Sequence, residues 1–250
     1  MLDTLNWSNP WAIALTLNTI LLIIAFISPK KLLTPVGYLN AVILGVLVWG
    51  TLGWRGYLIV MLFFLLGSAL TFVGIEQKEA EGIAEERSGM RGAGNVWGSA
   101  LAATICAIAT IFLASPIKEL FVLGYVASFC TKLSDTTASE VGKAYGKTTY
   151  LITNLKPVPR GTEGAVSLEG TLAGAFASVV LAVIAWVIGL ISAIGIIWCV
   201  IAAFIATTIE SLIGATLESR LPWLTNDLVN FINTVIGAIA AIALAFISTS

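Results

Sequence analysis

The sequence predicts an all-α fold, a polytopic membrane bundle of about eight transmembrane helices that forms a single domain over residues 1–250. Hydrophobic residues make up 58% of the chain and charged residues only 11%, whereas charged residues are roughly a quarter of a soluble protein. The mean hydropathy is +0.97. Because backbone groups in lipid must be hydrogen-bonded internally, helices are the expected spanning elements, and each needs roughly 20 apolar residues.

Eight apolar segments bounded by charged residues, glycine or proline are long enough to span a membrane. They are expected at about 11–27, 37–53, 56–75, 93–114, 117–138, 169–191, 194–216 and 227–248. Several tryptophans lie near the ends of these segments, where interfacial aromatic side chains are commonly found. Tight turns are expected at 54–55 and at 192–193.

The basic residues are concentrated in alternate loops. The first, third, fifth and seventh loops hold Lys30, Lys31, Lys78, Arg87, Arg91, Lys143, Lys147, Lys156, Arg160 and Arg220, and the opposite loops hold Arg55 and Lys118. The positive-inside rule then places the odd-numbered loops in the cytoplasm and both termini on the opposite side. Loops 76–92 and 139–168 are expected to form the catalytic face. In the first of these, Arg87 and Arg91 are four residues apart, so they either direct positive charge toward the mouth of the site or belong to a solvated helical hairpin.

Several classes of function are disfavoured by what the chain lacks. It contains no histidine, which excludes a Ser-His triad, histidine general-base catalysis and histidine-ligated zinc. Cys106, Cys130 and Cys199 lie apart in apolar segments without CxxC spacing, so we expect them to pack in the interior. Nucleic acid is not an expected partner. The first residues show no signal or transit peptide pattern.

Two acids lie near the cytoplasmic end of the fifth span. Asp135 and Glu140 are five residues apart, which separates them by about 140° around a helix. Either the helix unwinds around 136–139, or each acid serves a different ion or ligand. In both cases their oxygens, close to Lys143 and Lys147, suit Mg²⁺ held together with substrate phosphates. The alternative is an ordinary solvated helix end.

The segment that follows resembles a phosphate-binding loop without being one. Only three residues separate Gly142 from Gly146, whereas a Walker A motif has four between its glycines and follows a strand. We therefore reject a P-loop. Glycines beside Lys143 and Lys147 still allow close approach of backbone and charge to phosphate oxygens.

A stretch with two prolines leads into the sixth span. It carries Lys156 and Arg160, and Gly161 and Gly164 permit turns with positive φ. Such a loop is suited to holding its two cations at a fixed spacing. Ser167 is a plausible N-cap whose helix would attract an anion. The alternative is an ordinary linker between helices.

The seventh and eighth spans carry unusual polar residues. Glu210 lies inside an apolar segment, where an ionised carboxylate costs roughly 2.5–3.5 kcal/mol on insertion scales. One polar stripe consists of Thr207, Glu210, Gly214 and Glu218, and a second of Asn226, Asn230 and Asn233. Facing each other, the two stripes would complete a polar site. Hydrogen bonding between helices is the alternative role of the asparagines.

Three runs carry a resemblance to a known family. They are Ser-Asp-Thr-Thr-Ala-Ser-Glu-Val-Gly at 134–142, Lys-Pro-Val-Pro-Arg-Gly-Thr-Glu-Gly-Ala-Val-Ser at 156–167 and Thr-Asn-Asp-Leu-Val-Asn-Phe-Ile-Asn-Thr at 225–234. Together they resemble the integral-membrane family that contains plant and cyanobacterial phytyl-phosphate kinases, and the likeness covers most of the chain. The central motif also resembles, more loosely, the Gly-Asp-x-x-Ala segment and Glu-Gly loop of CTP-dependent phytol and dolichol kinases, with Ser134 in place of the glycine.

The resemblance implies transfer of the γ-phosphoryl group of CTP, or of another nucleoside triphosphate, to phytyl or geranylgeranyl monophosphate. The product, phytyl diphosphate, would serve the synthesis of tocopherol and related isoprenoid quinones in a cyanobacterial or other bacterial membrane. Because the acceptor oxygen is already anionic, no histidine base is required. The implied catalytic residues are Asp135, Lys156 and Arg160, and the implied Mg²⁺ ligands are Asp135, Glu140 and Glu210. The implied substrate- and nucleotide-binding residues are Ser134, Thr136, Ser139, Lys143, Lys147, Gly161, Thr162, Glu163, Gly164, Ser167, Asn226 and Asn230.

Two other functions fit parts of the pattern. A secondary transporter of a small or lipid-linked anion would place Glu210 and the asparagines at a midplane site, although we find no inverted repeat. A membrane cytidylyltransferase would use the same nucleotide but would release pyrophosphate instead of CDP.

Overall fold

The computed structural model describes residues 9–29, 31–85, 89–218 and 220–249. Its helices are α1 (Pro10–Ile27), α2 (Pro35–Thr71), α3 (Ile75–Ala80), α4 (Ala93–Ala109), α5 (Ile117–Tyr145), α6 (Leu168–Val187), α7 (Ala193–Ile213), the π-helix η2 (Gly214–Glu218) and α8 (Asn226–Thr249), and its strands are β1 (Thr149–Leu151), β2 (Pro157–Val158) and β3 (Ala165–Ser167). The predicted all-α polytopic membrane fold is confirmed, with one small sheet added in the fifth loop.

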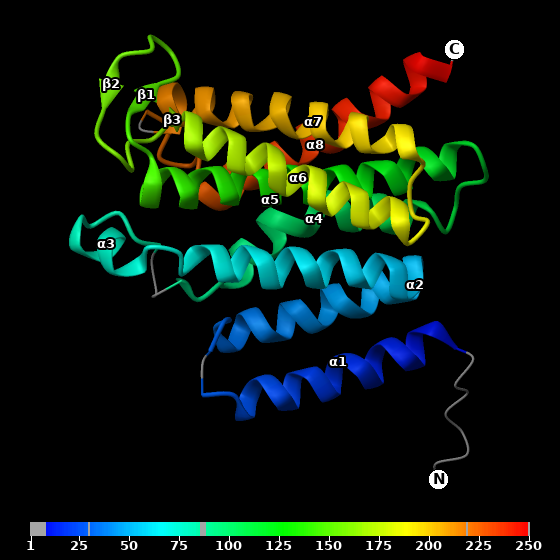
Figure 1. Ribbon diagram of the computed structural model, residues 1–250. Coiled ribbons are helices and arrows are strands. Elements are labelled where there is room, and N and C mark those ends of the chain that lie inside the picture. The colour runs from blue at the N-terminus through cyan, green and yellow to red at the C-terminus, as the bar shows by residue number, and fades with distance from the viewer. Residues whose placement is uncertain (1–8, 30, 86–88, 219, 250) are drawn as a thin grey trace.

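The second and third predicted spans form one element. α2 has 37 residues and breaks at Gly53, where φ is 65° and ψ is −160°, a conformation that glycine adopts readily. In Figure 1, α2 runs to one end of the bundle and returns beside itself. The tight turn expected at 54–55 is therefore present, one residue earlier.

Within the described residues, five helices are long and apolar enough to cross a membrane. These are α1, α2, α6, α7 with its π-helical continuation, and α8. α4 is a shorter apolar helix of 17 residues, and α5 carries polar and charged residues along its second half. Among these bundle helices, the least apolar, α5, is thus the one that carries Asp135 and Glu140.

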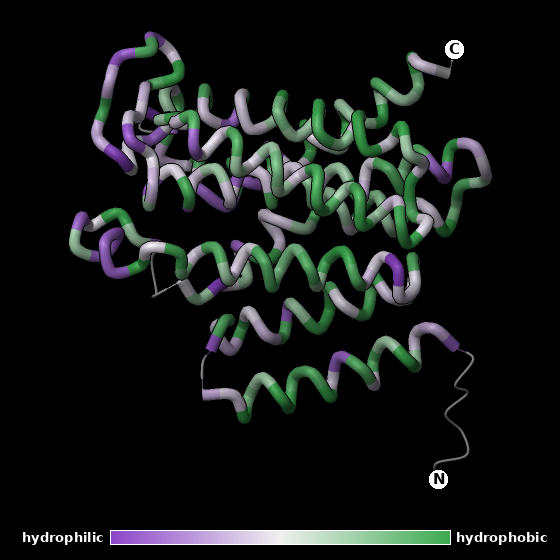
Figure 2. The backbone as a smooth tube through the Cα atoms, viewed as in Figure 1, coloured by the Kyte–Doolittle hydropathy of each residue, from purple (hydrophilic) through white to green (hydrophobic). Residues whose placement is uncertain are grey.

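The loops divide between two ends of the bundle as the sequence predicts. α1 begins and α8 ends at one end, and the three strands, α3 and the segment leading into α4 lie at the other (Figure 1). We call the latter the sheet end. Figure 2 shows hydrophobic residues along the helices and hydrophilic residues gathered there. Lys30 and Arg87 lie outside the described residues.

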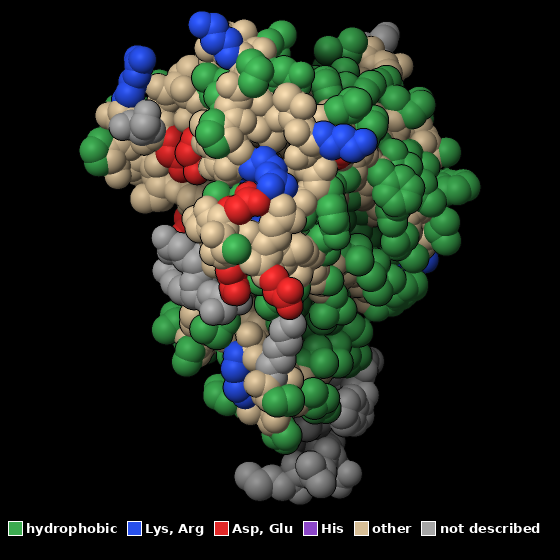
Figure 3. Space-filling view, turned by 60° about the vertical axis from the view of Figure 1, so that its left-hand side comes forward, with side chains coloured by type: hydrophobic (Ala, Val, Ile, Leu, Met, Phe, Trp, Pro, Cys, Tyr) green, Lys and Arg blue, Asp and Glu red, His purple; other side chains and the backbone are tan. Residues whose placement is uncertain are grey.

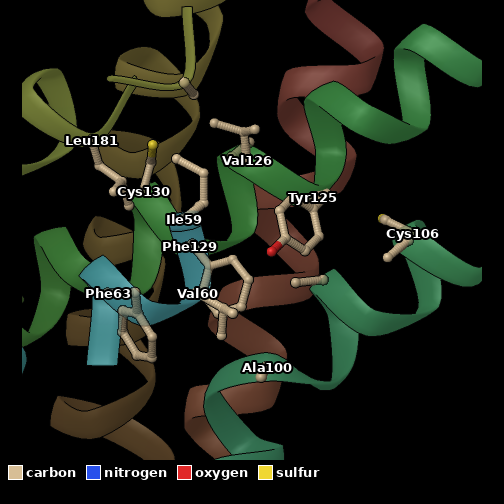
Figure 4. Packing of buried hydrophobic residues seen from close by; sticks show 14 of the residues in the cluster. Ile59, Val60, Phe63, Ala100, Cys106, Tyr125, Val126, Phe129, Cys130 and Leu181 are labelled. Atoms are coloured by element: carbon tan, nitrogen blue, oxygen red, sulfur yellow. The ribbon is translucent and has the colours of Figure 1, made fainter. Parts of the chain in front are cut away.

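α5 is the central helix, packed against α2, α4, α6, α7 and α8. Tyr125 and Phe129 are fully buried, with ring centroids 5.2 Å apart, and the Phe129 ring lies 5.1 Å from Phe63 of α2. The Tyr125 hydroxyl donates to the Gly56 carbonyl at 2.7 Å. Figure 4 shows this cluster, which includes the buried Cys106 and Cys130. The core therefore holds α5 rigidly, and α5 positions the polar groups at its far end.

α6 lies very close to α5 because two glycines face it. A Cβ atom at Gly170 would lie 2.5 Å from the Ala138 carbonyl oxygen, and one at Gly174 would lie 2.6 Å from the Ser134 carbonyl oxygen. Only glycine permits this approach, as in other membrane helix pairs.

α5 continues without interruption to Tyr145, seven residues beyond the predicted end of its span. The possibility that the helix unwinds around 136–139 is therefore wrong. Gly142 and Lys143 are helical rather than part of a loop. The remaining alternative, in which Asp135 and Glu140 serve different partners, agrees with the continuous helix.

The fifth loop folds into an antiparallel sheet with strand order β2-β1-β3, which the sequence did not lead us to expect. Thr149 pairs with Val158 on one side and with Ser167 on the other. Ser167 ends β3 and also caps α6, since its Oγ accepts a hydrogen bond from the Gly170 amide at 3.1 Å. The N-cap prediction is confirmed, and the sheet fixes the segment 157–167 against the helix ends.

We predict that Gly174→Leu destabilises the bundle. The added side chain would collide with the backbone of α5, and overpacking of this kind costs about 1–3 kcal/mol. Thermal unfolding of the purified protein in detergent should shift several degrees lower. Phe176→Leu, at an exposed position of the same helix, is the matched control, and equal unfolding temperatures for the two variants would contradict the close packing.

Candidate active site

A large cavity lies at the sheet end of the bundle. Its volume is about 1080 Å³, and it is lined by residues of α4 to α8, of the fifth loop and of the segment before α4. Figure 3 brings this end forward and shows Lys, Arg, Asp and Glu side chains on it, next to a flank covered by hydrophobic side chains. The cavity therefore lies where a polar substrate and a membrane-embedded one can both reach it.

Most of the residues that the sequence selects meet in this cavity. Its lining includes Ser134, Asp135, Thr136, Ser139, Glu140, Lys143, Gly161, Thr162, Glu163, Gly164, Ser167, Glu210, Asn226 and Asn230. Asp135 and residues 161–167 of the fifth loop thus share one cavity.

Three of the selected cations lie elsewhere. Lys147 and Lys156 are exposed, and neither lines the cavity. Arg160 also lies outside the lining, and its Nη2 donates to Glu81 Oε1 at 2.5 Å. The arrangement expected for these three, a clamp on phosphates inside the site, is not what the structure shows. Arg160 instead ties the 157–167 segment to the residue that follows α3.

One cluster surrounds Asp135. The Lys132 ammonium donates to Asp135 and, at 2.5 Å, to Asn230 Oδ1. Asp135 also contacts the Glu210 carboxyl group directly. Two carboxylates that lie this close must share a proton or a cation, because like charges repel. The predicted meeting of the two polar stripes is therefore present, with Lys132 and Asp135 of α5 between them.

A further oxygen belongs to the same cluster. Asn233 Nδ2 donates to Glu210 Oε2 at 2.5 Å, and Asn233 is 1% exposed. Its Oδ1 has no hydrogen-bond partner among the described residues. A buried amide oxygen without a partner costs free energy, and it is a hard ligand of the kind that Mg²⁺ binds.

A second pair of acids lies nearby. Glu163, from the fifth loop, contacts Glu218 at the end of η2. A Cβ atom at Gly214 would lie 3.6 Å from Glu218 Oε2 and 3.7 Å from Glu163 Oε2. Gly164 faces the same turn, since its Cβ would lie 2.5 Å from the Ser211 carbonyl oxygen. The glycines therefore let the loop approach α7 closely enough for the two carboxylates to meet.

Glu140 has a different partner. It forms an ion pair with Lys78 of α3, and both side chains are almost completely buried. The Lys78 ammonium also donates to the Thr71 carbonyl oxygen at 2.8 Å. This pair fastens α3 to α5. Glu140 lines the cavity, but its ion pair is with Lys78, which does not.

Arg91 and Lys143 supply further positive charge to the cavity. Lys143 Nζ lies 3.6 Å from Glu85 Oε1, and the Arg91 guanidinium lies 5.5 Å from the centre of the Phe63 ring. Burial is the largest influence on the pKa of Arg91 and lowers it, while Glu85 and Glu140 act in the opposite direction. Arginine stays protonated under such conditions. Arg91 is thus a permanent cation on the cavity wall.

Acids outnumber bases in the cavity. Among the described residues the lining holds seven acids, namely Glu85, Asp135, Glu140, Glu163, Glu210, Glu218 and Asp227, and three bases, namely Arg91, Lys132 and Lys143. An unaccompanied polyanion would be repelled by this surplus. No group of three or more acids or cysteines is placed to hold a metal in the described part of the chain; Mg²⁺ is commonly bound by only one or two carboxylates, with waters and substrate phosphates completing its coordination.

Sequence reasoning missed several contributors. Nothing in the sequence pointed to a role for Lys132 beyond its spacing of three residues from Asp135, which is the spacing of neighbours on a helix. Asn95 donates to Asp227 Oδ1 at 3.1 Å and accepts from the Gly92 amide at 3.0 Å. Asp227 is adjacent to the predicted Asn226, so the motif at 225–234 was the available signal.

The fold and the cavity define a polytopic integral membrane protein with an acidic, amine-bearing site at one end of its bundle. The chain belongs to the family described as integral membrane protein DUF92, whose model matches residues 18–238. The resemblance drawn from the three sequence runs is thereby confirmed at the level of the family.

The chain is 62% identical over 235 residues to an uncharacterized membrane protein of Synechocystis sp., covering 94% of this chain and 91% of the relative. It is 46% identical over 241 residues to the protein named VTE6, chloroplastic, of Arabidopsis thaliana, covering 94% and 72%. It is 30% identical over 217 residues to an uncharacterized membrane protein of Methanocaldococcus jannaschii, covering 86% and 87%. No solved structure matches.

We predict that Lys78→Met destabilises the protein strongly. It would leave Glu140 buried and unpaired, which costs about 3–5 kcal/mol. The double variant Lys78→Met/Glu140→Met should recover much of that loss, because no uncompensated charge remains. Unfolding in detergent measures both.

The control for this cycle is Glu85→Gln, which removes the partly exposed pair with Lys143 and should change stability by less than about 1 kcal/mol. If Lys78→Met were as mild as the control, the buried pair would not be what holds α3 in place.

Proposed function

We propose that this protein is a prenyl-phosphate kinase that transfers the γ-phosphoryl group of CTP to phytyl monophosphate or a close relative. The observation that carries the proposal is the convergence, in one cavity, of two carboxylate pairs with Arg91, Lys132 and Lys143. The resemblance of the motifs to phytyl-phosphate kinases supports the choice of acceptor, and their looser resemblance to CTP-dependent kinases supports the choice of nucleotide.

The residues of the Asp135 cluster fit Mg²⁺. This ion is commonly held by one or two carboxylates together with substrate phosphates, and here Asp135 and Glu210 are in contact, while Asn233 Oδ1 has no hydrogen-bond partner among the described residues. Glu163 and Glu218 form a second two-carboxylate group. Bound Mg²⁺ would neutralise the phosphates and offset the acidic surplus. In this proposal Asp135 and Glu210 hold the metal, and Glu140 is a structural partner of Lys78.

The basic residues of the cavity have two roles. Lys132 bridges Asp135 and Asn230 and so orients the carboxylate, while Lys143 and Arg91 offer positive charge to phosphate oxygens. Because the attacking oxygen of a monophosphate is already anionic, the enzyme needs alignment of two phosphates and shielding of their repulsion, not a general base. A chain without histidine is therefore adequate for this chemistry.

The fifth loop closes the site from outside. In the proposal, the pair between Arg160 and Glu81 holds the 157–167 segment over the cavity, so Arg160 acts as a positioning residue. Lys147 and Lys156, which are exposed near the same segment, attract the nucleotide from solution. By the positive-inside rule the sheet end faces the cytoplasm, where the nucleotide is present.

Asp135→Asn should lower kcat by at least about 100-fold, because it removes a charge that orients the metal and the transferring phosphoryl group. The measurement is transfer of labelled γ-phosphate from CTP to phytyl monophosphate by purified protein. Glu169→Gln, which changes an acid at the same end of the bundle that does not line the cavity, should keep nearly full activity. Normal turnover by Asp135→Asn would remove the metal assignment.

Product analysis separates this proposal from its rivals. We expect CDP and phytyl diphosphate in equal amounts, formed only when Mg²⁺ is present. A cytidylyltransferase would release pyrophosphate and leave a cytidylylated lipid. A transporter reconstituted in vesicles would move its anion without consuming nucleotide, so either result would exclude the kinase.

A further inference from the structure

A second cavity of about 210 Å³ lies between α1, α2 and α4. Its wall is almost entirely aliphatic and aromatic, with residues such as Leu21, Val42 and Phe64. It shares Arg91, Asn95 and Ser99 with the large polar cavity. The two cavities are therefore adjacent, and Arg91 lies on the wall of both.

The apolar cavity runs inward from the level of Arg91. The Arg91 backbone pairs with Leu32 and Thr34, just before α2 begins. Gly45, which also lines the cavity, is ten residues into α2 and therefore roughly 15 Å deeper, by the rise of a helix. That is about half of a hydrocarbon layer of roughly 30 Å.

A polar pair lies at the inner end of the cavity. The Tyr57 hydroxyl donates to Asn18 Oδ1 at 3.0 Å, and Asn18 packs so closely on Gly45 that a Cβ atom there would lie 2.1 Å from Asn18 Oδ1. Both Tyr57 and Asn18 are buried. The cavity is therefore apolar along its length, with a polar pair at its inner end and Arg91 at the other end, which we call its mouth.

The guanidinium at the mouth is available for a phosphate. Among the described residues no carboxylate lies within ion-pairing distance of Arg91. Gly67 leaves room for the side chain, since a Cβ atom there would lie 2.7 Å from Arg91 Nη2. Guanidinium groups bind phosphate oxygens with two parallel hydrogen bonds.

We infer that the first isoprene units of the acceptor occupy the cavity between α1, α2 and α4, with the phosphate at Arg91 and the rest of the chain in the bilayer. The inference rests on the proposed kinase function and adds to it a binding site for the acceptor. An apolar barrel with one cationic mouth is complementary to an amphiphile with an apolar chain and one phosphate. Because the bilayer is as apolar as the cavity, moving the tail from lipid into the cavity contributes little binding free energy. Its effect is to hold the phosphate at a fixed depth beside the metal site.

Substitution in the wall tests the site. Ala41→Phe places a ring in the cavity, and Ile43→Phe places one at an exposed position of the same helix. We expect Ala41→Phe to raise KM for geranylgeranyl monophosphate by about ten-fold or more, a change that corresponds to clashes of this size. KM for CTP and for dimethylallyl monophosphate, a single isoprene unit, should stay within about two-fold of the wild type. Equal values for the two variants would overturn the assignment.

Photolabelling gives a second test that needs neither turnover nor a folded variant. Wild-type protein in lipid nanodiscs is irradiated with a geranylgeranyl monophosphate that carries a diazirine on its tail, and the labelled peptides are identified. Labelling within 10–27, 35–64 or 93–109 that excess unlabelled geranylgeranyl monophosphate displaces supports the site. Labelling confined to 171–208, between α6 and α7, overturns it, and so does labelling that phosphatidic acid displaces equally well.

The two experiments distinguish failure of the acceptor site from failure of the proposed kinase function. If the wild type transfers phosphate but neither assay responds to the cavity, the acceptor site is wrong and the kinase stands. If the wild type shows no transfer to any prenyl monophosphate, the proposed function fails, and displaceable labelling of the three segments still decides whether a prenyl phosphate binds there.

Discussion

The contact between Lys132, Asp135 and Glu210 is the constraint on which the site depends. These groups lie on helices of a membrane bundle, where an uncompensated charge is costly. Lys132 compensates one carboxylate, and the second must share a proton or a cation with the first. The Asp135 and Glu210 carboxylates therefore need more positive charge than Lys132 supplies, and they lie next to a cavity large enough for two phosphate-bearing molecules. The buried Asn233 Oδ1, which has no hydrogen-bond partner among the described residues, is a further oxygen that a cation would satisfy.

The sheet end is held together by electrostatic links that lie outside this cluster. Lys78 joins α3 to Glu140 of α5, and Arg160 joins the fifth loop to Glu81. The short sheet and the Ser167 cap then connect the loop to α6. As a result, segments that are polar and distant in sequence enclose one cavity, while the hydrophobic packing of α5 around Phe129 fixes the helix that carries Asp135.

Hydropathy and the distribution of basic residues predicted the fold well, because in a membrane every span must be apolar and long enough, and every loop must lie at one end or the other. The same logic located Asp135, Glu210 and the asparagines, since polar groups in spans need partners. It failed for Arg160, because a basic residue in a loop pairs with whatever acid the fold brings near, and Glu81 lies 79 residues away. It also gave no sign that Lys156 would be exposed and away from the cavity. The small sheet was also missed, since strands of two or three residues carry little pattern.

The central claim is that the acidic surplus of the cavity makes nucleotide binding depend on a divalent cation. The most direct measurement is the affinity of purified protein in nanodiscs for a non-hydrolysable CTP analogue, by calorimetry with Mg²⁺ and with EDTA. The account predicts that removing Mg²⁺ weakens binding by at least about ten-fold, because the free nucleotide would then meet unscreened carboxylates. Equal affinity under the two conditions, or no binding in either, would contradict it.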